Sequence, residues 1–263
     1  MRIQVDDKTV YAYTGTKPPI AQQPTVVFVH GAANDHSVWA LQSRYFAYHG
    51  FNVLAVDLPG HGKSAGPALE TIEQMAGWML RLLDAAGVTS ANLVGHSMGS
   101  LIALETAAAA PPRVAKLALV GTAFPMKVSD VLLSTAAAGD HAALEMINVW
   151  SHSADGQTGG NRAPGQWIMG ASLRLLERTA SPLYNDFNAC NQYAQGEASA
   201  AKLTCPVLMI SGTRDVMTPP RAARSLADKL TNVRTVTIEG SGHDLMAEQP
   251  DAVLDALIGF LRP

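Results

Sequence analysis

The stretch LVGHSMGSLIALETA, from Leu93 to Ala107, decides how this sequence is expected to fold. Apolar, strand-like residues precede Ser97, and an alanine-rich segment with helical character follows it. Ser97 stands between Gly95 and Gly99, which gives the pattern Gly-x-Ser-x-Gly where a strand meets a helix. A side chain at either glycine would collide with the strand or the helix, and the tight turn forces strained backbone angles on the serine. The stretch therefore predicts a serine pushed out at the end of a strand.

Five further segments rich in β-branched and apolar residues flank this stretch along the chain. Most are nearly continuous in apolar character, which is typical of strands covered on both faces. Helical patterns lie between them, as in residues 72–87 and 251–261. This alternation predicts the α/β class, with a mostly parallel central sheet and helices on both faces. The six predicted strands are Thr25–His30, Asn52–Asp57, Ala91–Ser97, Lys116–Gly121, Pro206–Ser211 and Arg234–Glu239.

The alternation is interrupted once, between residues 122 and 201. This part contains helical patterns and a loop rich in Gly, Asn and Gln at residues 155–164, but no convincing strand. About 80 residues are too many for a plain crossover between neighbouring strands. We therefore predict a core formed by residues 1–121 and 202–263, with residues 122–201 as a helical insertion that stands on the sheet.

The composition argues against several classes of protein. Apolar residues make up 48% and charged residues 16% of the chain, which indicates one folded core and not a disordered segment. The net charge is -3 and no basic run could follow a phosphate backbone, so nucleic acid is not an expected partner. Asp6 and Asp7 lie where a secretory signal would be apolar, and no membrane span is expected. We expect a soluble, cytoplasmic protein, although a chain trimmed of its signal peptide would look the same.

No sequence pattern points to a metal or a cofactor. The two cysteines, Cys190 and Cys205, lack metal-ligand spacing and are expected to be buried free thiols. The eight histidines include no HExxH pattern, and no GxGxxG follows a strand. We therefore expect chemistry that depends on side chains and backbone groups alone. The oligomeric state stays open at this point.

Ser97 needs partners, because a serine hydroxyl is a poor nucleophile at neutral pH without a base. Two candidates follow predicted strands, namely Asp215 in GTRDVMTPP and His243 in GSGHDLMAEQP. Loops that follow parallel strands open at the same edge of a sheet, so the three residues can converge. The chain order Ser, Asp, His is the order expected for a nucleophile on a strand-to-helix turn.

These motifs resemble those of the α/β-hydrolase fold superfamily over essentially the full length of the chain. The matching segments are His30–Gly31, Ala55–Ser64 (AVDLPGHGKS), Gly95–Gly99, and the loops that hold Asp215 and His243. The resemblance implies that the insertion is a cap, or lid, over the active site.

The resemblance also implies an oxyanion hole made of backbone amides. The N–H groups of Met98 and Ala32 are the expected donors, with Ala33 as the competitor for the second position. Such amides are already oriented when negative charge develops on the substrate oxygen.

Apolar side chains of the insertion are candidates for a substrate pocket. Trp150, Trp167 and Met126 belong to a set that a lid equally needs for packing on the core, so both interpretations stay open. His36 either lines the pocket or begins the next helix. Asp244, which follows the predicted base, is expected to point away from the site.

The predicted reaction is hydrolysis by acyl transfer on a carboxylic ester or lactone of a small to medium, largely apolar substrate. One alternative is a hydrolase of carbon-carbon bonds in ring-cleavage diketone acids, whose carboxylate could meet Arg162, Arg174 or Arg178. Another alternative is a ligand receptor that keeps the triad but turns over little substrate.

Overall fold

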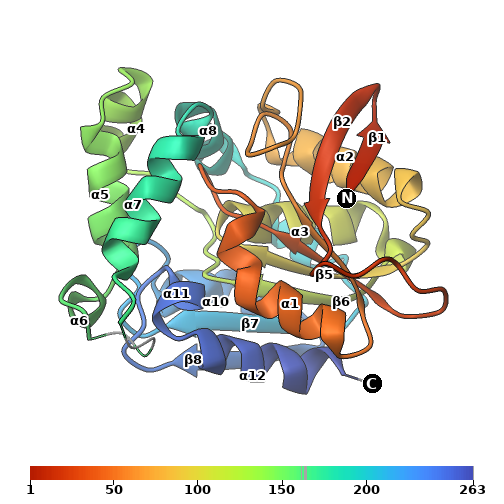
Figure 1. Cartoon of the computed structure of the whole chain (residues 1–263). Coiled ribbons are helices and arrows are strands. Elements are labelled where there is room, and N and C mark those ends of the chain that lie inside the picture. The colour runs from red at the N-terminus through yellow and green to blue at the C-terminus, as the bar shows by residue number, and fades with distance from the viewer. Residues whose placement is uncertain (161, 163–164, 263) are drawn as a thin grey trace.

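The computed structural model describes residues 1–160, 162 and 165–262 (Figure 1). One sheet of eight strands runs through the molecule in the order β1-β2-β4-β3-β5-β6-β7-β8. Pairing is antiparallel between β1 and β2 and between β2 and β4, and parallel from β4 to β8. The strands are β1 (Arg2–Val5), β2 (Lys8–Tyr13), β3 (Thr25–Val29), β4 (Asn52–Val56), β5 (Ala91–His96), β6 (Val114–Val120), β7 (Val207–Gly212) and β8 (Val233–Ile238). The predicted class is confirmed.

The sequence patterns do not predict the two N-terminal strands, β1 and β2. They form a hairpin whose turn residues Asp6 and Asp7 both have positive φ angles, 49° and 58°. Positive φ at both central residues is typical of the two-residue hairpin turn that matches strand twist. Only alternate residues of β1 and β2 are buried, so these strands lack the nearly continuous apolar run that marks most of the other six.

Helices cover both faces of the sheet. α2 and α3 pack on one face, and α1 and α12 pack on the other. The longer core helices are α1 (Ala40–Tyr48), α2 (Ile72–Ala85), α3 (Met98–Ala109) and α12 (Pro250–Leu261), with α10 (Arg224–Ala227) and α11 (Leu245–Glu248) as single turns. None of the described helices is both long and apolar enough to cross a membrane.

The chain between β6 and β7 forms a helical insertion, as expected. Its helices are α4 (Asp130–Ala137), α5 (Ala142–Ser151), α6 (Ala154–Gln157), α7 (Ile168–Thr179), α8 (Leu183–Gln192) and α9 (Gly196–Ala200). Figure 1 shows α4, α5, α7 and α8 standing together at one end of the sheet. Within the predicted loop 155–164, residues 161, 163 and 164 lie outside the described residues.

A third apolar cluster joins the insertion to the core. Leu132, Leu144, Ile147 and Phe187 of the insertion pack around Ala33, which follows strand β3. α9 packs instead on α3, so the last turn of the insertion lies against the core. The boundaries predicted for a separate cap therefore remain a proposal. Both cysteines are free thiols, but only Cys190 is fully buried.

Candidate active site

Ser97 lies on a strained turn between β5 and α3. Its backbone has φ 52° and ψ -120°, a combination that L-residues rarely adopt. A Cβ on Gly95 would lie 2.1 Å from the carbonyl oxygen of Gly99, and a Cβ on Gly99 would lie 2.4 Å from that of Val29. Side chains at these positions would therefore collide with the helix and with the strand, as the sequence pattern predicts.

His243 and Asp215 form a buried hydrogen-bonded pair. The His243 Nδ1–H donates to Asp215 Oδ2 over 2.8 Å. Asp215 is also held by the backbone N–H groups of Met217 and Thr218, at 2.9 and 2.7 Å, and by the Thr218 hydroxyl at 2.7 Å. Because Nδ1 is engaged, Nε2 is the imidazole nitrogen left to accept a proton. Ser97 and His243 line the same two cavities.

The pairing of His243 with Asp215 shifts the pKa values of the two groups in opposite directions. Burial alone would raise the pKa of Asp215, but the nearby His243 and the hydrogen bonds from Thr218 outweigh it and lower the pKa to about 2. Burial alone would lower the pKa of His243, but Asp215 and then Asp244 outweigh it and raise the pKa. A carboxylate that stays ionised beside a more basic imidazole is the arrangement a general base needs.

In the loop after β3, the amide of Ala33 is engaged, whereas the amide of Ala32 has no acceptor among the described residues. The Ala33 N–H donates to Asp186 Oδ2 of helix α8 over 2.9 Å, and the Ala33 carbonyl accepts from the Thr179 hydroxyl over 2.5 Å. Ala33 itself has a φ of 49°. Its N–H is therefore already used, which leaves Ala32 as the better candidate for an oxyanion donor. Ala32 lines both cavities beside Ser97.

Met98 follows Ser97 as the first residue of α3 and is fully buried. The first amides of a helix lack intrahelical acceptors, so the Met98 N–H is available to a developing oxyanion.

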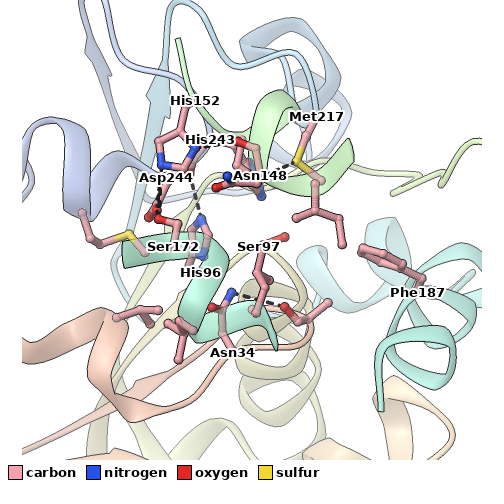
Figure 2. A pocket seen from close by; sticks show the side chains of 18 residues that line it. Asn34, His96, Ser97, Asn148, His152, Ser172, Phe187, Met217, His243 and Asp244 are labelled. Carbon is pink, nitrogen blue, oxygen red and sulfur yellow. Dashed lines mark hydrogen bonds and ion pairs between the residues drawn. The ribbon is translucent and has the colours of Figure 1, made fainter. Parts of the chain in front are cut away.

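Two cavities meet at Ser97. The inner one has a volume of about 60 Å³ and is lined in part by polar side chains, and the outer one has about 230 Å³ and is mainly apolar. Figure 2 shows His96, His152, Ser172 and Asp244 on one side of Ser97, and Phe187 on the other side. The polar residues of the inner cavity include Asn34, His96, Asn148, Ser151, His152, Ser172 and Asp244; the outer cavity is lined by Met126, Val128, Leu132, Trp150, Phe187, Cys190, Val216 and Met217, among others.

Two of the four predicted lining residues lie at these cavities. Trp150 and Met126 line the outer one. Trp167 is 73% exposed at the start of α7, where its ring packs over Gly170, so placing it in the pocket was wrong. His36 is also absent from the described lining, because its imidazole is drawn to Asp57.

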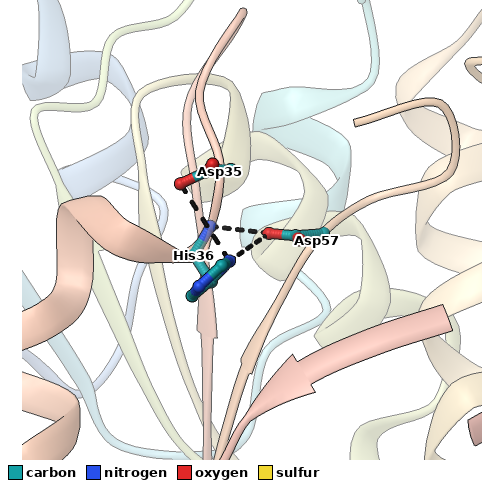
Figure 3. Close-up of side chains that lie close together, drawn as sticks. All are labelled: Asp35, His36 and Asp57. Carbon is teal, nitrogen blue, oxygen red and sulfur yellow. Dashed lines mark hydrogen bonds and ion pairs between the residues drawn. The ribbon is translucent and has the colours of Figure 1, made fainter. Parts of the chain in front are cut away.

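Figure 3 shows a cluster formed by Asp35, His36 and Asp57. Each residue offers one potential metal-binding atom, and these atoms lie close enough together to hold a metal ion. Each carboxylate oxygen already accepts a hydrogen bond. Asp57 Oδ1 accepts from the His36 backbone N–H and ring N–H, and Oδ2 accepts from the Lys63 N–H. Asp35 accepts from Ser37 and from the Arg178 guanidinium. These contacts join loops of the core to α7 and support a structural role.

Asp244 does not point away from the site, contrary to expectation. Its Oδ2 accepts from the Ser172 hydroxyl over 3.0 Å and lies 3.4 Å from His152 Nε2. Asp244 therefore ties the loop of the predicted base to helix α7 and to the end of α5. The sequence gives no signal for this contact, because Ser172 and His152 belong to helical patterns that are distant in the chain.

His61 and Asp186 form a second buried pair that sequence reasoning missed. His61 Nε2 donates to Asp186 Oδ2 over 2.8 Å, and His61 Nδ1 donates to the Pro59 carbonyl over 3.0 Å. Burial opposes charge on His61, but Asp186 outweighs it and the pKa of His61 is raised. A pairing across 125 residues of chain is not visible in any local pattern.

Comparison with known proteins gives relatives that match only part of the chain and relatives that match most of it. The chain is 44% identical over 98 residues to a dihydrolipoyllysine-residue acetyltransferase component of an acetoin cleaving system from Cupriavidus necator, a match that covers 36% of this chain but only 26% of that protein. It is 23% identical over 247 residues to (E)-2-((N-methylformamido)methylene)succinate hydrolase from Acinetobacter baylyi, and that match covers 90% of each chain.

Among solved structures, the enol-lactonase from Burkholderia xenovorans superposes with a TM-score of 0.87 at 26% identity, over 99% of both chains. The sequence profile of the alpha/beta hydrolase family matches residues 26–256, which include every strand from β4 to β8 and all three predicted triad residues. The chain belongs to the alpha/beta hydrolase family.

Proposed function

We propose that this protein is a serine hydrolase that cleaves a carboxylic ester or a lactone through an acyl-enzyme. The observation that carries the proposal is the convergence of the strained Ser97 with the His243–Asp215 pair at two joined cavities. Family membership supports hydrolysis in general, and the site supports this kind of hydrolysis.

In the proposed reaction, His243 Nε2 takes the proton of the Ser97 hydroxyl as the oxygen attacks the substrate carbonyl. Asp215 fixes the imidazole tautomer and stabilises the imidazolium. The amides of Ala32 and Met98 then receive the oxyanion, and one such donor typically contributes about 3–4 kcal/mol to the transition state. His243 returns its proton to the leaving oxygen, and water activated by the same imidazole releases the acid.

The outer cavity favours a small to medium apolar group on one side of the scissile bond. Its volume of about 230 Å³ lies just below the range typical of drug-sized ligand sites, and its walls are mainly apolar. Similarity to an enol-lactonase over the whole chain is compatible with lactones as well as open esters.

Two of the three arginines that could have met a ring-cleavage acid, Arg174 and Arg178, are engaged elsewhere. Arg178 pairs with Asp35 over 2.6 Å, and Arg174 pairs with Glu177 over 2.6 Å. Neither residue lines the two cavities at Ser97. These pairings favour esters and lactones over the carbon-carbon bond as substrate.

The test is a panel of p-nitrophenyl acyl esters and lactones, assayed with the wild type and with Ser97→Ala. We expect many turnovers per active site in the wild type and loss of at least a thousandfold in the variant. A single acylation without turnover would support the receptor alternative. Equal rates of hydrolysis in the two proteins would mean that Ser97 is not the nucleophile.

A further inference from the structure

His96 is the last residue of β5 and directly precedes the nucleophile, yet the proposed reaction gives it no role. It is 4% exposed. Its ring packs edge-on against Trp39 at the end of the 3-10 helix η1 (His36–Trp39), with ring centroids 6.4 Å apart and planes at 83°. The His243 ring is also close, with a centroid distance of 4.8 Å. A polar ring that is buried in this way needs a hydrogen bond to offset the loss of water.

The hydrogen bond of this ring goes to the backbone of the predicted base. His96 Nε2–H donates to the His243 carbonyl over 2.9 Å (Figure 2). A carbonyl oxygen can only accept, so Nε2 carries the proton. Burial, and then the nearby His243, lower the pKa of His96 to about 4, and the ring is therefore neutral at neutral pH. His96 is thus an uncharged donor in a fixed tautomer.

The bonded carbonyl belongs to a peptide unit that is held at both ends. Its other end is the Asp244 N–H, which donates to the Ser151 carbonyl over 2.8 Å. Because the two ends of a planar peptide are rigidly connected, these two bonds fix the unit that follows the Cα atom of His243. The insertion supplies one bond, through Ser151 at the end of α5, and the strand that leads to the nucleophile supplies the other.

The preceding part of this loop is held from elsewhere. The Ser241 carbonyl accepts from the Arg214 N–H over 2.9 Å, and the Gly242 N–H donates to Glu248 Oε1 over 2.9 Å. Arg214 lies in the loop of the predicted acid, and Glu248 is the last residue of α11. Among the described backbone hydrogen bonds of the loop, the His96 bond is the one that leads to the strand of the nucleophile.

The nucleophile itself lies on a rigid turn. The Ser97 N–H donates to the Val120 carbonyl of β6 over 2.9 Å. His243, by contrast, comes from a loop 147 residues after His96 in the chain. Proton transfer from Ser97 to His243 needs a hydrogen-bonding distance, and a misplacement of about 1 Å can lower a rate by about a hundredfold. A bond from the residue before the nucleophile to the backbone of the base can set this distance.

We propose that His96 is a positioning residue whose bond to the His243 carbonyl keeps the imidazole of the base within reach of the Ser97 hydroxyl. The inference rests on the proposed hydrolase function and adds a residue to its machinery. His96 acts through His243 and neither takes nor gives a proton in the reaction. The Gly95–Gly99 turn therefore carries both the nucleophile and the donor that aligns its base.

Two substitutions separate the hydrogen bond from the bulk of the ring. His96→Leu fills a similar volume without a donor, and His96→Gln keeps an N–H donor at about the position of Nε2. With p-nitrophenyl butyrate, we expect kcat of His96→Leu to fall about tenfold to a hundredfold with a smaller change in KM. His96→Gln retains the bond and should stay within about fivefold of the wild type. Where His96→Leu does not fold, His96→Met replaces it.

A double-mutant cycle with His243→Ala determines whether His96 acts through the base. Without the base, the residual hydrolysis comes from the oxyanion hole and substrate binding, and it is measured above the uncatalysed rate. In that background we expect His96→Leu to change kcat/KM by about twofold or less, because no imidazole is left to position.

Thr106→Val is the matched control for the structural cost of losing a buried hydrogen bond. The Thr106 hydroxyl is fully buried and donates to the Ile102 carbonyl over 2.7 Å within α3, the helix that follows the nucleophile. This bond has no connection to the loop of the base. We expect kcat of Thr106→Val to stay within about twofold of the wild type.

Several results would overturn the inference while the hydrolase function stands. One is a kcat of His96→Leu close to that of the wild type. Another is an equal loss in His96→Leu and His96→Gln, because the ring and not the bond would then matter. A loss that persists in the His243→Ala background, or an equal loss in Thr106→Val, would mean that His96 does not act through the base. If the wild type turns over no ester, or if Ser97→Ala is equally active, the proposed function fails and the inference fails with it.

Discussion

The proposed mechanism makes the charge state of His243 decisive for activity. In that mechanism His243 accepts the Ser97 proton only when its imidazole is neutral. Asp215 and Asp244 raise its pKa although burial opposes this shift. The neutral base is therefore lost at a higher pH than for an ordinary histidine.

We expect kcat/KM to fall on the acid side with a midpoint above 6.5, the ordinary value of a histidine pKa. In Asp215→Asn the main charge that raises this pKa is removed, so the midpoint should move to lower pH. The plateau should fall by about ten-thousandfold, the loss typical of a triad whose imidazole is no longer oriented. Profiles between pH 5 and 9 check both effects, and a wild-type midpoint below 6.5 would contradict the assignment of His243 as the base.

At the scale of the element, two helices of the insertion hold the loop that carries the predicted oxyanion donor. Asp186 of α8 accepts from the Ala33 N–H, and Thr179 of α7 donates to the Ala33 carbonyl. Both backbone groups of Ala33 are thus fixed by side chains more than 140 residues away in sequence. Ala32 directly precedes Ala33 in the chain, so we expect the position of the insertion to determine where the Ala32 N–H, the proposed oxyanion donor, points.

Asp186→Ala should therefore lower kcat by about ten- to a hundredfold with a smaller change in KM, because a buried unpaired N–H costs about 1–3 kcal/mol and Ala33 can shift. Arg178→Ala is the matched control. It also removes a contact from the insertion to this loop, the pair with Asp35, but its side chain is 63% exposed and such pairs contribute little. Steady-state kinetics of both variants test this prediction. A change of Asp186→Ala confined to KM, or an equal loss of kcat in the two variants, would mean that Asp186 does not position the loop.

Across the whole molecule, local sequence patterns predict the turn at Ser97 and most of the strands, because steric contacts and burial within short segments determine these features. The Gly95 collision involves only the backbone of the same turn, whereas the Gly99 collision involves strand β3. Five of the six parallel strands carry their burial in nearly continuous apolar runs, and β8 does not. The contacts of Asp186 and Asp244 depend on where the insertion lies, which no local pattern encodes. Trp150 and Trp167 have the same apolar character, yet one lines a cavity and the other is 73% exposed. Helical periodicity cannot tell whether an apolar side chain packs in the core, lines a cavity or is exposed to solvent.

The buried Asp215 should also make the stability of the whole fold depend on pH. Its folded pKa of about 2 lies below the ordinary 3.8, so its ionisation stabilises the fold above pH 3.8, and this contribution is lost as the pH falls through 2. The difference amounts to about 2 kcal/mol at neutral pH. Urea unfolding of the wild type and Asp215→Asn should therefore show a stability gap that narrows by more than about 1 kcal/mol between pH 5 and pH 2.5. A gap that stays constant over this range would mean that the carboxylate is not stabilised by its partners in the folded protein.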